Sequence, residues 1–128
     1  MRFLLDTHLL VWAAGSPERL SNTAHTLIQD PSNSLVFSVV SIWEVAIKHG
    51  LGRQEFRTDP RVFRLRLLSN GFEELLVTGE QAIGVATLPP LHRDPFDRLL
   101  IAQASAEGLT LLSADRLVAA YPGPILRV

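Results

Sequence analysis

Five carboxylates in this sequence are suited to metal or acid–base chemistry, because each follows a predicted strand or lies on a predicted helix. They are Asp6, Glu44, Asp94, Asp97 and Asp115. Acids that recur at strand-to-helix junctions converge at one edge of a parallel sheet, which is where open α/β folds bind ligands. The sequence therefore predicts an acidic pocket.

Carboxylates that share a pocket repel one another. At about 5 Å and an effective dielectric constant near 20, each like-charge pair costs on the order of 3 kcal/mol. A bound cation or raised pKa values would make the cluster tolerable. The chain has no Cys, so oxygen or imidazole must hold any metal, and a carboxylate-rich site favours Mg²⁺ or Mn²⁺. These ions commonly support phosphoryl chemistry.

Taken singly, the acids also have structural explanations. Asp6, Asp94 and Asp115 each stand before a predicted helix and are suited to be its N-cap. Glu44 precedes Lys48 by one helical turn, and such a surface pair is worth about 0.2–0.5 kcal/mol. These alternatives stay open for each acid alone, and the joint occurrence of the acids favours the pocket.

Asp97 is harder to explain as a purely structural residue. It falls in the first turn of a predicted helix, where a negative charge complements the helix dipole. However, Leu100 and Ile101 continue from it along an inward side of that helix. An acid on that side needs a partner.

Alternating strands and helices must position these acids. Apolar runs predict strands, whereas helical spacing between capping residues and Gly or Pro predicts helices. The predicted strands cover residues 2–5, 35–38, 72–77, 110–113 and 125–128, the last at a sheet edge. The predicted helices cover residues 7–14, 21–29, 40–49, 59–69, 94–106, a segment from a capping box at Thr78 and Gln81 to Pro89, and a short helix from Asp115.

Composition predicts one globular domain. The 128 residues suffice for a single core, and no repeat or linker divides them. The alternation of elements predicts a layered α/β fold with a mostly parallel sheet. The longest apolar runs are far shorter than the roughly 20 residues of a membrane-spanning helix, and Asp6 interrupts the only stretch that resembles a signal peptide. We therefore expect a cytoplasmic protein that does not associate with a membrane.

The basic residues permit a polyanionic partner. The net charge is −1, yet all but one of the 12 basic side chains are Arg, which suits bidentate phosphate contacts. The candidates for phosphate contact are Arg53, Arg57, Arg61, Arg64, Arg93 and Arg98. His25, His49 and His92 show no ligand spacing, so we predict no metal role for them.

Four segments carry a family pattern in their order and spacing. They are Phe3–His8, Ser41–Lys48, His92–Ala104 and Leu111–Asp115. Together they resemble the PIN-domain ribonucleases, and among these the VapC toxins of bacterial and archaeal toxin–antitoxin pairs, over nearly the whole chain. Two departures stand out: His8 replaces the Asn that many relatives carry, and Ala114 replaces a larger polar residue. Neither removes a carboxylate.

The resemblance implies a single PIN-like domain at residues 1–128, folded as a three-layer α/β/α sandwich with a mostly parallel central sheet. It also implies that Asp6, Glu44, Asp97 and Asp115 form a catalytic cluster that binds Mg²⁺ or Mn²⁺, with Asp94 as an adjacent acid. The implied activity is endonucleolytic hydrolysis of RNA by a metal-activated water, with 5′-phosphate and 3′-hydroxyl products. Such a protein is the toxin of a type II toxin–antitoxin pair.

Individual roles follow from this assignment. Asp6 and Asp97 are expected to be the principal metal ligands, and Glu44 to bind through water or to orient the attacking water. Asp115 completes the site or holds a second ion. The hydroxyls of Thr7 and Ser113 either position water or phosphate at the same edge or serve as turn and cap residues. His8 contacts phosphate or belongs to the helix surface.

The resemblance also implies partners. A VapC-like toxin forms a homodimer and is inhibited by a cognate VapB-like antitoxin, whose C-terminal segment reaches the acidic site. DNA contact would then be indirect, through the antitoxin. Leu9, Leu10, Trp12 and Ala13 either seat that segment or belong to the core.

Two other functions compete with hydrolysis of RNA. A noncatalytic PIN-like module would bind RNA or protein, but it has no need of four mutually repelling acids. A phosphatase or receiver domain uses an aspartate beside Mg²⁺, but His8 stands where the haloacid-dehalogenase type needs a second acid. Lys48, the only Lys, is not late in the chain as a receiver requires.

Overall fold

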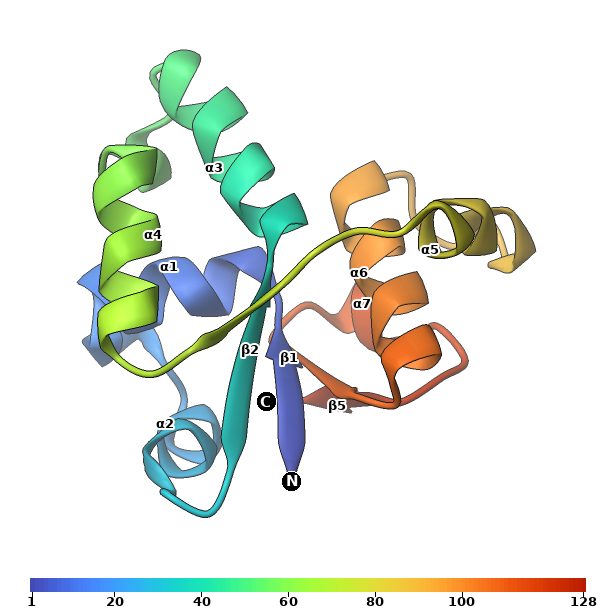
Figure 1. Cartoon of the computed structure of the whole chain (residues 1–128), viewed down its shortest axis with the longest axis horizontal. Helices are drawn as coiled ribbons and strands as arrows, with labels where there is room; N and C mark the ends of the chain where they lie inside the picture. The colour runs from blue at the N-terminus through green and yellow to red at the C-terminus, as the bar shows by residue number, and fades with distance from the viewer.

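Five parallel strands form the central sheet of the computed structural model, which describes all of residues 1–128 (Figure 1). The strands are β1 (Arg2–Leu5), β2 (Ser34–Ser38), β3 (Glu73–Leu75), β4 (Thr110–Ser113) and β5 (Ile125–Arg127), in the spatial order β3-β2-β1-β4-β5. Because every neighbouring pair is parallel, all carboxyl ends lie at the same edge of the sheet. This edge receives the segments that carry the acids.

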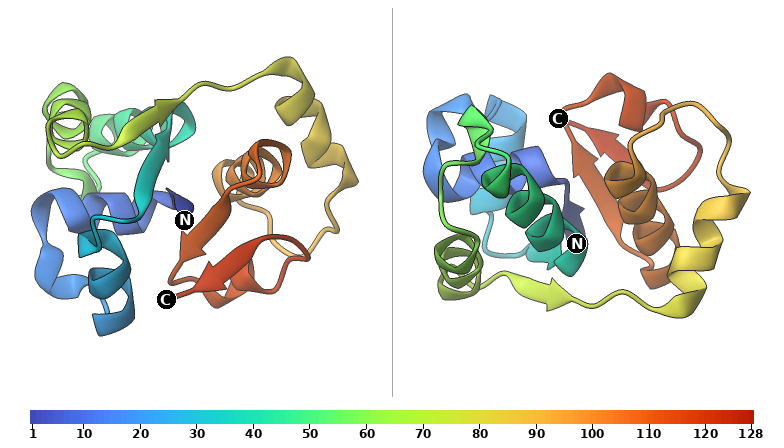
Figure 2. Two further views of the ribbon diagram at one scale, coloured as in Figure 1. Left: turned by 60° about the horizontal axis from the view of Figure 1, so that its bottom comes forward. Right: turned by 90° about the horizontal axis from the view of Figure 1, so that it is seen from above.

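Helices cover both faces of the sheet, as the two views of Figure 2 also show. On one face lie α1 (Thr7–Gly15), α2 (Asn22–Gln29) and α4 (Pro60–Ser69), and on the other lie α5 (Gly79–Gly84), α6 (Pro95–Glu107) and α7 (Arg116–Ala119). Helix α3 (Val39–Gly50) leaves the carboxyl end of β2, and the 3₁₀ turns are η1 (Pro17–Arg19), η2 (Gln54–Phe56) and η3 (Val85–Thr87). The predicted three-layer α/β/α fold is confirmed. No helix is long and apolar enough to span a membrane.

Two apolar clusters hold the layers together. Along β1, Phe3 and Leu5 point into the cluster under α1 and α4, whereas Leu4 points into the cluster under α6. This is the period-two alternation of a strand that is buried on both faces. Helix α3 contributes Val45 to the first cluster and Val40 to the second, so it is anchored to both halves of the core.

Two element predictions need correction. The strand expected at residues 72–77 is shorter, since β3 covers only Glu73–Leu75. Phe72 packs in the core before the strand begins, and Leu76 and Val77 are exposed after it ends. The apolar residues on which the prediction was based therefore extend beyond the three that pair with β2.

The helix that starts after Thr78 also ends early. Its predicted capping box with Gln81 is present, but α5 stops at Gly84 and continues as a 3₁₀ turn instead of reaching Pro89. A Cβ at Gly84 would lie 3.8 Å from the Cβ of Ala102. This distance is an ordinary van der Waals contact, so packing against α6 does not require glycine here, and the poor helix propensity of glycine accounts for the early end of α5.

A chain of buried amides fixes α6 relative to β2. Gln103 is fully buried, accepts a hydrogen bond from the Ser38 hydroxyl, and donates to the Leu76 carbonyl at 3.2 Å and to Gln81 Oε1 at 3.1 Å. Gln81 in turn donates to Glu107 at 2.7 Å. Buried polar groups are stable only when they are paired, so this network specifies one placement of α6 and its N-terminal acids.

Replacing Gln103 by leucine is expected to lower the free energy of unfolding by about 1–3 kcal/mol, because the Ser38 hydroxyl and the Leu76 carbonyl lose their partners. Urea denaturation of the variant measures this loss. The same substitution at exposed Gln54 is the control and should change stability by less than about 0.5 kcal/mol. Equal stability of the two variants would contradict the role assigned to this network.

Candidate functional site

A cavity of about 240 Å³ opens at the carboxyl edge of the sheet. It is lined by Asp6, His8, Trp12, Glu44, His92, Asp94, Asp97, Ala114 and Asp115. The five acids selected from the sequence all line this cavity, although they come from the ends of β1 and β4, from α3, and from the start of α6. The parallel topology brings them together.

Asp6 is held at the end of β1 by hydrogen bonds of its backbone and of its carboxylate. Its backbone N–H donates to the Leu112 carbonyl at 3.0 Å, its Oδ1 accepts the Leu9 N–H at 3.0 Å, and its Oδ2 accepts the Ser113 hydroxyl. Only 4% of the residue is exposed. Burial raises the pKa of Asp6 above its ordinary value, against the hydrogen bonds from Ser113 and Leu9. Asp6 is thus both an N-cap and a lining residue of the cavity.

Glu44 is buried on α3 with both carboxylate oxygens engaged. The Thr7 hydroxyl lies 2.6 Å from Oε1 and 2.9 Å from the Ser41 hydroxyl, and Lys48 donates to Oε2. Lys48 also lies over the ring of Phe56, with 5.2 Å from its ammonium to the ring centre. The pairing suggested by sequence is therefore present, but it is a buried pair that fixes the carboxylate and not a surface pair.

Asp94 and Asp97 lie at the start of α6 with different partners. Asp94 Oδ1 caps the helix by accepting the N–H groups of Phe96 at 2.9 Å and Asp97 at 3.2 Å. Asp97 Oδ2 lies 2.9 Å from His92 Nε2. Burial and, next in size, the charge of Asp94 raise the pKa of Asp97 to about 7, against the lowering effect of the hydrogen bond with His92.

Asp115 is the exposed acid of the cavity. Its Oδ1 caps α7 by accepting the Leu117 N–H at 2.8 Å, and its own N–H donates to the Ser113 hydroxyl at 3.1 Å. Ser113 therefore connects Asp115 to Asp6. The hydroxyls of Thr7 and Ser113 do lie at the predicted edge, where they hold carboxylates in place.

The cavity has the donor chemistry of a divalent cation site. The second carboxylate oxygens of Asp94, Asp97 and Asp115 make no hydrogen bond within the chain. Burial is the main cause of the raised pKa values of Asp6 and Asp97, and repulsion from neighbouring carboxylates adds to it, from Glu44 at Asp6 and chiefly from Asp94 at Asp97. A cation would remove that repulsion and favour the ionised forms.

The position of His92 differs from what we expected from the sequence. We predicted no metal role for it, yet its imidazole lies in the cavity, and ligand atoms of His92, Asp94 and Asp97 lie within 4.8 Å of one another. The sequence signal that could have identified it is its position two residues before Asp94, inside the family motif. His8 was expected either to contact phosphate or to belong to the surface of its helix. It is exposed on α1 and lines the cavity, and its Nε2 lies 3.2 Å from Glu55 Oε2, so both alternatives remain compatible with its position.

Hydrogen bonding and burial decide two points that the sequence left open. The guanidinium of Arg98 donates to the Pro89 carbonyl and the Tyr121 hydroxyl, each at 2.9 Å, so it supports the chain and is not available for phosphate. Leu9 and Leu10 are fully buried core residues and cannot seat a partner. Trp12, in contrast, reaches the cavity.

Comparisons with known proteins agree on one fold. The sequence profile of the PIN domain family matches residues 3–123 of this chain. Ribonuclease VapC22 of Mycobacterium tuberculosis is 29% identical over 122 residues, which cover 94% of this chain and 92% of that protein. A solved structure of VapBC2 from Rickettsia felis, bound to a DNA fragment from their promoter, has a chain with a TM-score of 0.72 at 17% identity, covering 99% of this chain and 98% of that one.

A second solved structure is that of VapC20 from Mycobacterium tuberculosis, a sarcin–ricin loop cleaving toxin. It has a TM-score of 0.65 at 14% identity, covering 93% of this chain and 95% of that one. At these identities, the likeness to both solved structures is a likeness of fold.

The metal-free fold is expected to lose stability as pH rises. Since the pKa of Asp97 is about 7 in the folded chain and near 3.8 without its surroundings, the folded state binds an additional proton between about pH 4 and 7, and stability falls with rising pH across that window. Asp97→Asn removes this effect and should raise the free energy of unfolding at pH 8 by about 1–3 kcal/mol.

Urea denaturation in EDTA at pH 5 and pH 8 measures this gain. The gain should be smaller at pH 5, where Asp97 is already protonated. Glu18→Gln, at an exposed acid of η1, is the control and should leave stability unchanged at both pH values. A destabilised Asp97→Asn variant at pH 8 would contradict the electrostatic account of the cavity.

Proposed function

Because this chain belongs to the PIN domain family, we propose that it is a metal-dependent endoribonuclease and the cytoplasmic toxin of a type II toxin–antitoxin pair, built as a single domain over residues 1–128. The convergence of Asp6, Glu44, Asp97 and Asp115 in one cavity carries this proposal. The similarity to Ribonuclease VapC22 over 94% of the chain supports ribonuclease activity.

The metal ligands in this proposal are Asp6 and Asp97, with Glu44 and Asp115 completing the site and Asp94 adjacent to it. Oxygen donors of this kind suit Mg²⁺ or Mn²⁺. When bound, such an ion supplies an activated water and neutralises charge on the phosphate oxygens. The free carboxylate oxygens of Asp97 and Asp115 are the chain's own support for this assignment.

The remaining residues hold the acids in a fixed arrangement. Thr7 and Lys48 leave Glu44 little freedom to rotate, which suits a group that must accept or orient a proton of water. Ser113 links Asp6 to Asp115. Arg93 is exposed beside Asp94 and is suited to contact an RNA phosphate.

Neutralising the central acids is expected to abolish cleavage. Asp6→Asn and Asp97→Asn should each lower the rate of RNA cleavage by on the order of 100-fold or more, since even the hydrogen-bond partners of metal ligands are worth about 10–100-fold. EDTA should stop cleavage by the unaltered protein, and Mg²⁺ or Mn²⁺ should restore it. The measurement is gel analysis of labelled RNA with purified protein free of antitoxin.

Glu18→Gln, which lies outside the cavity, is the matched control and should cut RNA at the normal rate. Circular dichroism tests whether all variants are folded. Cleavage that persists in EDTA would refute metal dependence. RNA binding without cleavage, under any metal, would instead favour the noncatalytic PIN-like module.

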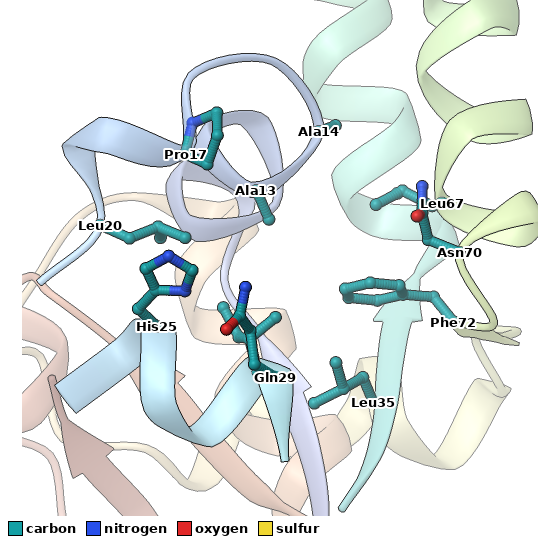
Figure 3. A pocket seen from close by; sticks show the side chains of 11 residues that line it. Ala13, Ala14, Pro17, Leu20, His25, Gln29, Leu35, Leu67, Asn70 and Phe72 are labelled. Carbon is teal, nitrogen blue, oxygen red and sulfur yellow. The ribbon is translucent and has the colours of Figure 1, made fainter. Parts of the chain in front are cut away.

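A second, mostly apolar cavity supports the proposed antitoxin contact. It measures about 260 Å³ and lies between the end of α1, α2 and the end of α4 (Figure 3). Leu20, Leu35 and Phe72 line it together with Ala13, which follows Trp12 of the acidic cavity on α1. We therefore propose that an apolar segment of a VapB-like antitoxin binds in this cavity, and that the antitoxin chain then follows α1 to the acidic cavity. DNA contact would come only through that antitoxin.

We also propose a homodimer. Trp43 and Ile47, one turn apart on α3, are 58% and 39% exposed and offer an apolar face to a second copy. Trp43 packs edge-on against Phe96 at 5.0 Å between ring centres, so this face borders the start of α6.

A bulky charge in the apolar cavity should weaken inhibition. Ala13→Arg is expected to reduce affinity for the antitoxin encoded beside this chain by about tenfold or more, because the substitution fills the cavity and buries a charge against apolar side chains. Calorimetric titration measures the affinity. Ala82→Arg, at an exposed site of α5 on the opposite face, is the control. Equal affinity for both variants would place the antitoxin elsewhere.

A further inference from the structure

We propose that His92 is a ligand of the metal in the acidic cavity and makes the site prefer first-row transition-metal ions to Mg²⁺. The inference rests on the proposed function, because it concerns the same cavity and the same ion. The residues that the family resemblance assigns to the site are all carboxylates. An imidazole among them changes the chemistry of the donor set.

The geometry of His92 is that of a ligand. His92 Nε2 lies 2.9 Å from Asp97 Oδ2, and two ligand atoms that bind one ion at about 2.1 Å and at a right angle are about 3 Å apart. Asp94 adds a third ligand atom, and all three lie within 4.8 Å of one another. The existing spacing therefore needs little adjustment for a cation to replace the hydrogen bond.

Asp94 and Asp97 can contribute without giving up their other roles. Asp94 uses Oδ1 to cap α6, and its Oδ2 is free of partners within the chain. Asp97 pairs with His92 through Oδ2 alone. In the whole chain, this is the one group of three His, Cys, Asp or Glu residues with ligand atoms so close together.

The backbone of His92 is fixed independently of its side chain. The Tyr121 hydroxyl accepts the His92 N–H at 2.8 Å and lies 3.0 Å from the His92 carbonyl, to which it donates. Tyr121 is 4% exposed, and Arg98 donates to the same hydroxyl at 2.9 Å. Arg98 also donates to the carbonyls of Val85 and Pro89, at 3.1 and 2.9 Å. A loop residue anchored in this way presents its imidazole in a defined direction, as metal ligands require.

Imidazole alters which ions the cavity binds well. Mg²⁺ strongly favours oxygen ligands, whereas neutral imidazole suits first-row transition metals, whose affinities rise from Mn²⁺ to Co²⁺ and beyond. A site in which an imidazole joins the carboxylates of the cavity should therefore bind Co²⁺ and Mn²⁺ more tightly than Mg²⁺. This preference would be weaker in a site made of carboxylates alone.

Electron spin-echo spectroscopy of the full-length protein loaded with Mn²⁺ tests the assignment directly, because a coordinated imidazole adds ¹⁴N modulation to the Mn²⁺ signal. We expect this modulation in the unaltered protein and in His8→Ala, which removes the other imidazole of the cavity. We expect it to be lost in His92→Ala and in His92→Gln. The second variant keeps a polar side chain in case the alanine variant does not fold.

Calorimetric titration supplies a second readout. Both His92 variants should bind Co²⁺ about tenfold or more weakly, with little change in affinity for Mg²⁺. Equal loss of affinity for both ions would mean that His92 only orients Asp97, and it would overturn the inference. Nitrogen modulation that is absent from the Mn²⁺-loaded protein, or that persists without His92, would also overturn it.

RNA cleavage by the unaltered protein in Mg²⁺ separates this inference from the proposed function. If the protein cuts RNA but its Mn²⁺ signal shows no nitrogen, then only the role of His92 is wrong. If it neither cuts RNA nor binds any of the three ions, then the proposed function fails as well.

Discussion

The burial of several carboxylates side by side at the carboxyl edge of the sheet is the constraint on which the rest of this structure depends. Asp6, Glu44 and Asp97 lie in a largely buried cavity, where charges are screened less than in water. Burial, with a smaller contribution from the neighbouring carboxylates, raises the pKa values of Asp6 and Asp97. An arrangement with this cost is explained most simply by a cation that binds there.

The chain places a different compensating group beside each buried acid. Asp6 accepts hydrogen bonds from Ser113 and from a backbone N–H, whereas Glu44 has a hydroxyl and an ammonium as partners. Asp97 has the imidazole of His92. These groups hold the carboxylates in place without filling the space between them, so the cavity remains available for an ion and a phosphate.

The scaffold makes this arrangement rigid. Helix α3 is anchored in both apolar clusters through Val40 and Val45. The position of Glu44 is therefore fixed relative to both halves of the core. Gln103 fixes α6 against β2 and thereby the position of Asp97. Functional groups on packed helices and strand ends are positioned more precisely than groups on loops. The exception is His92, whose loop is tied to Tyr121 and Arg98 instead.

Local patterns were sufficient to predict most of the fold. The apolar run before Asp6 predicted the buried strand β1, and the capping residues before α1, α4 and α6 predicted where those helices begin. These signals are local because hydrogen bonds and caps act over a few residues. The strand β3 was predicted too long, since its length depends on how far β2 extends beside it.

By itself, the sequence determined the order of the elements and which acids stand at their ends, because strand and helix periodicity and helix capping are properties of short segments. Only the tertiary structure decided that the pair between Glu44 and Lys48 is largely buried, that the guanidinium of Arg98 is held by loop carbonyls, and that His92 reaches Asp97. Burial and the direction of a loop side chain depend on packing between distant segments. No spacing within one segment encodes them.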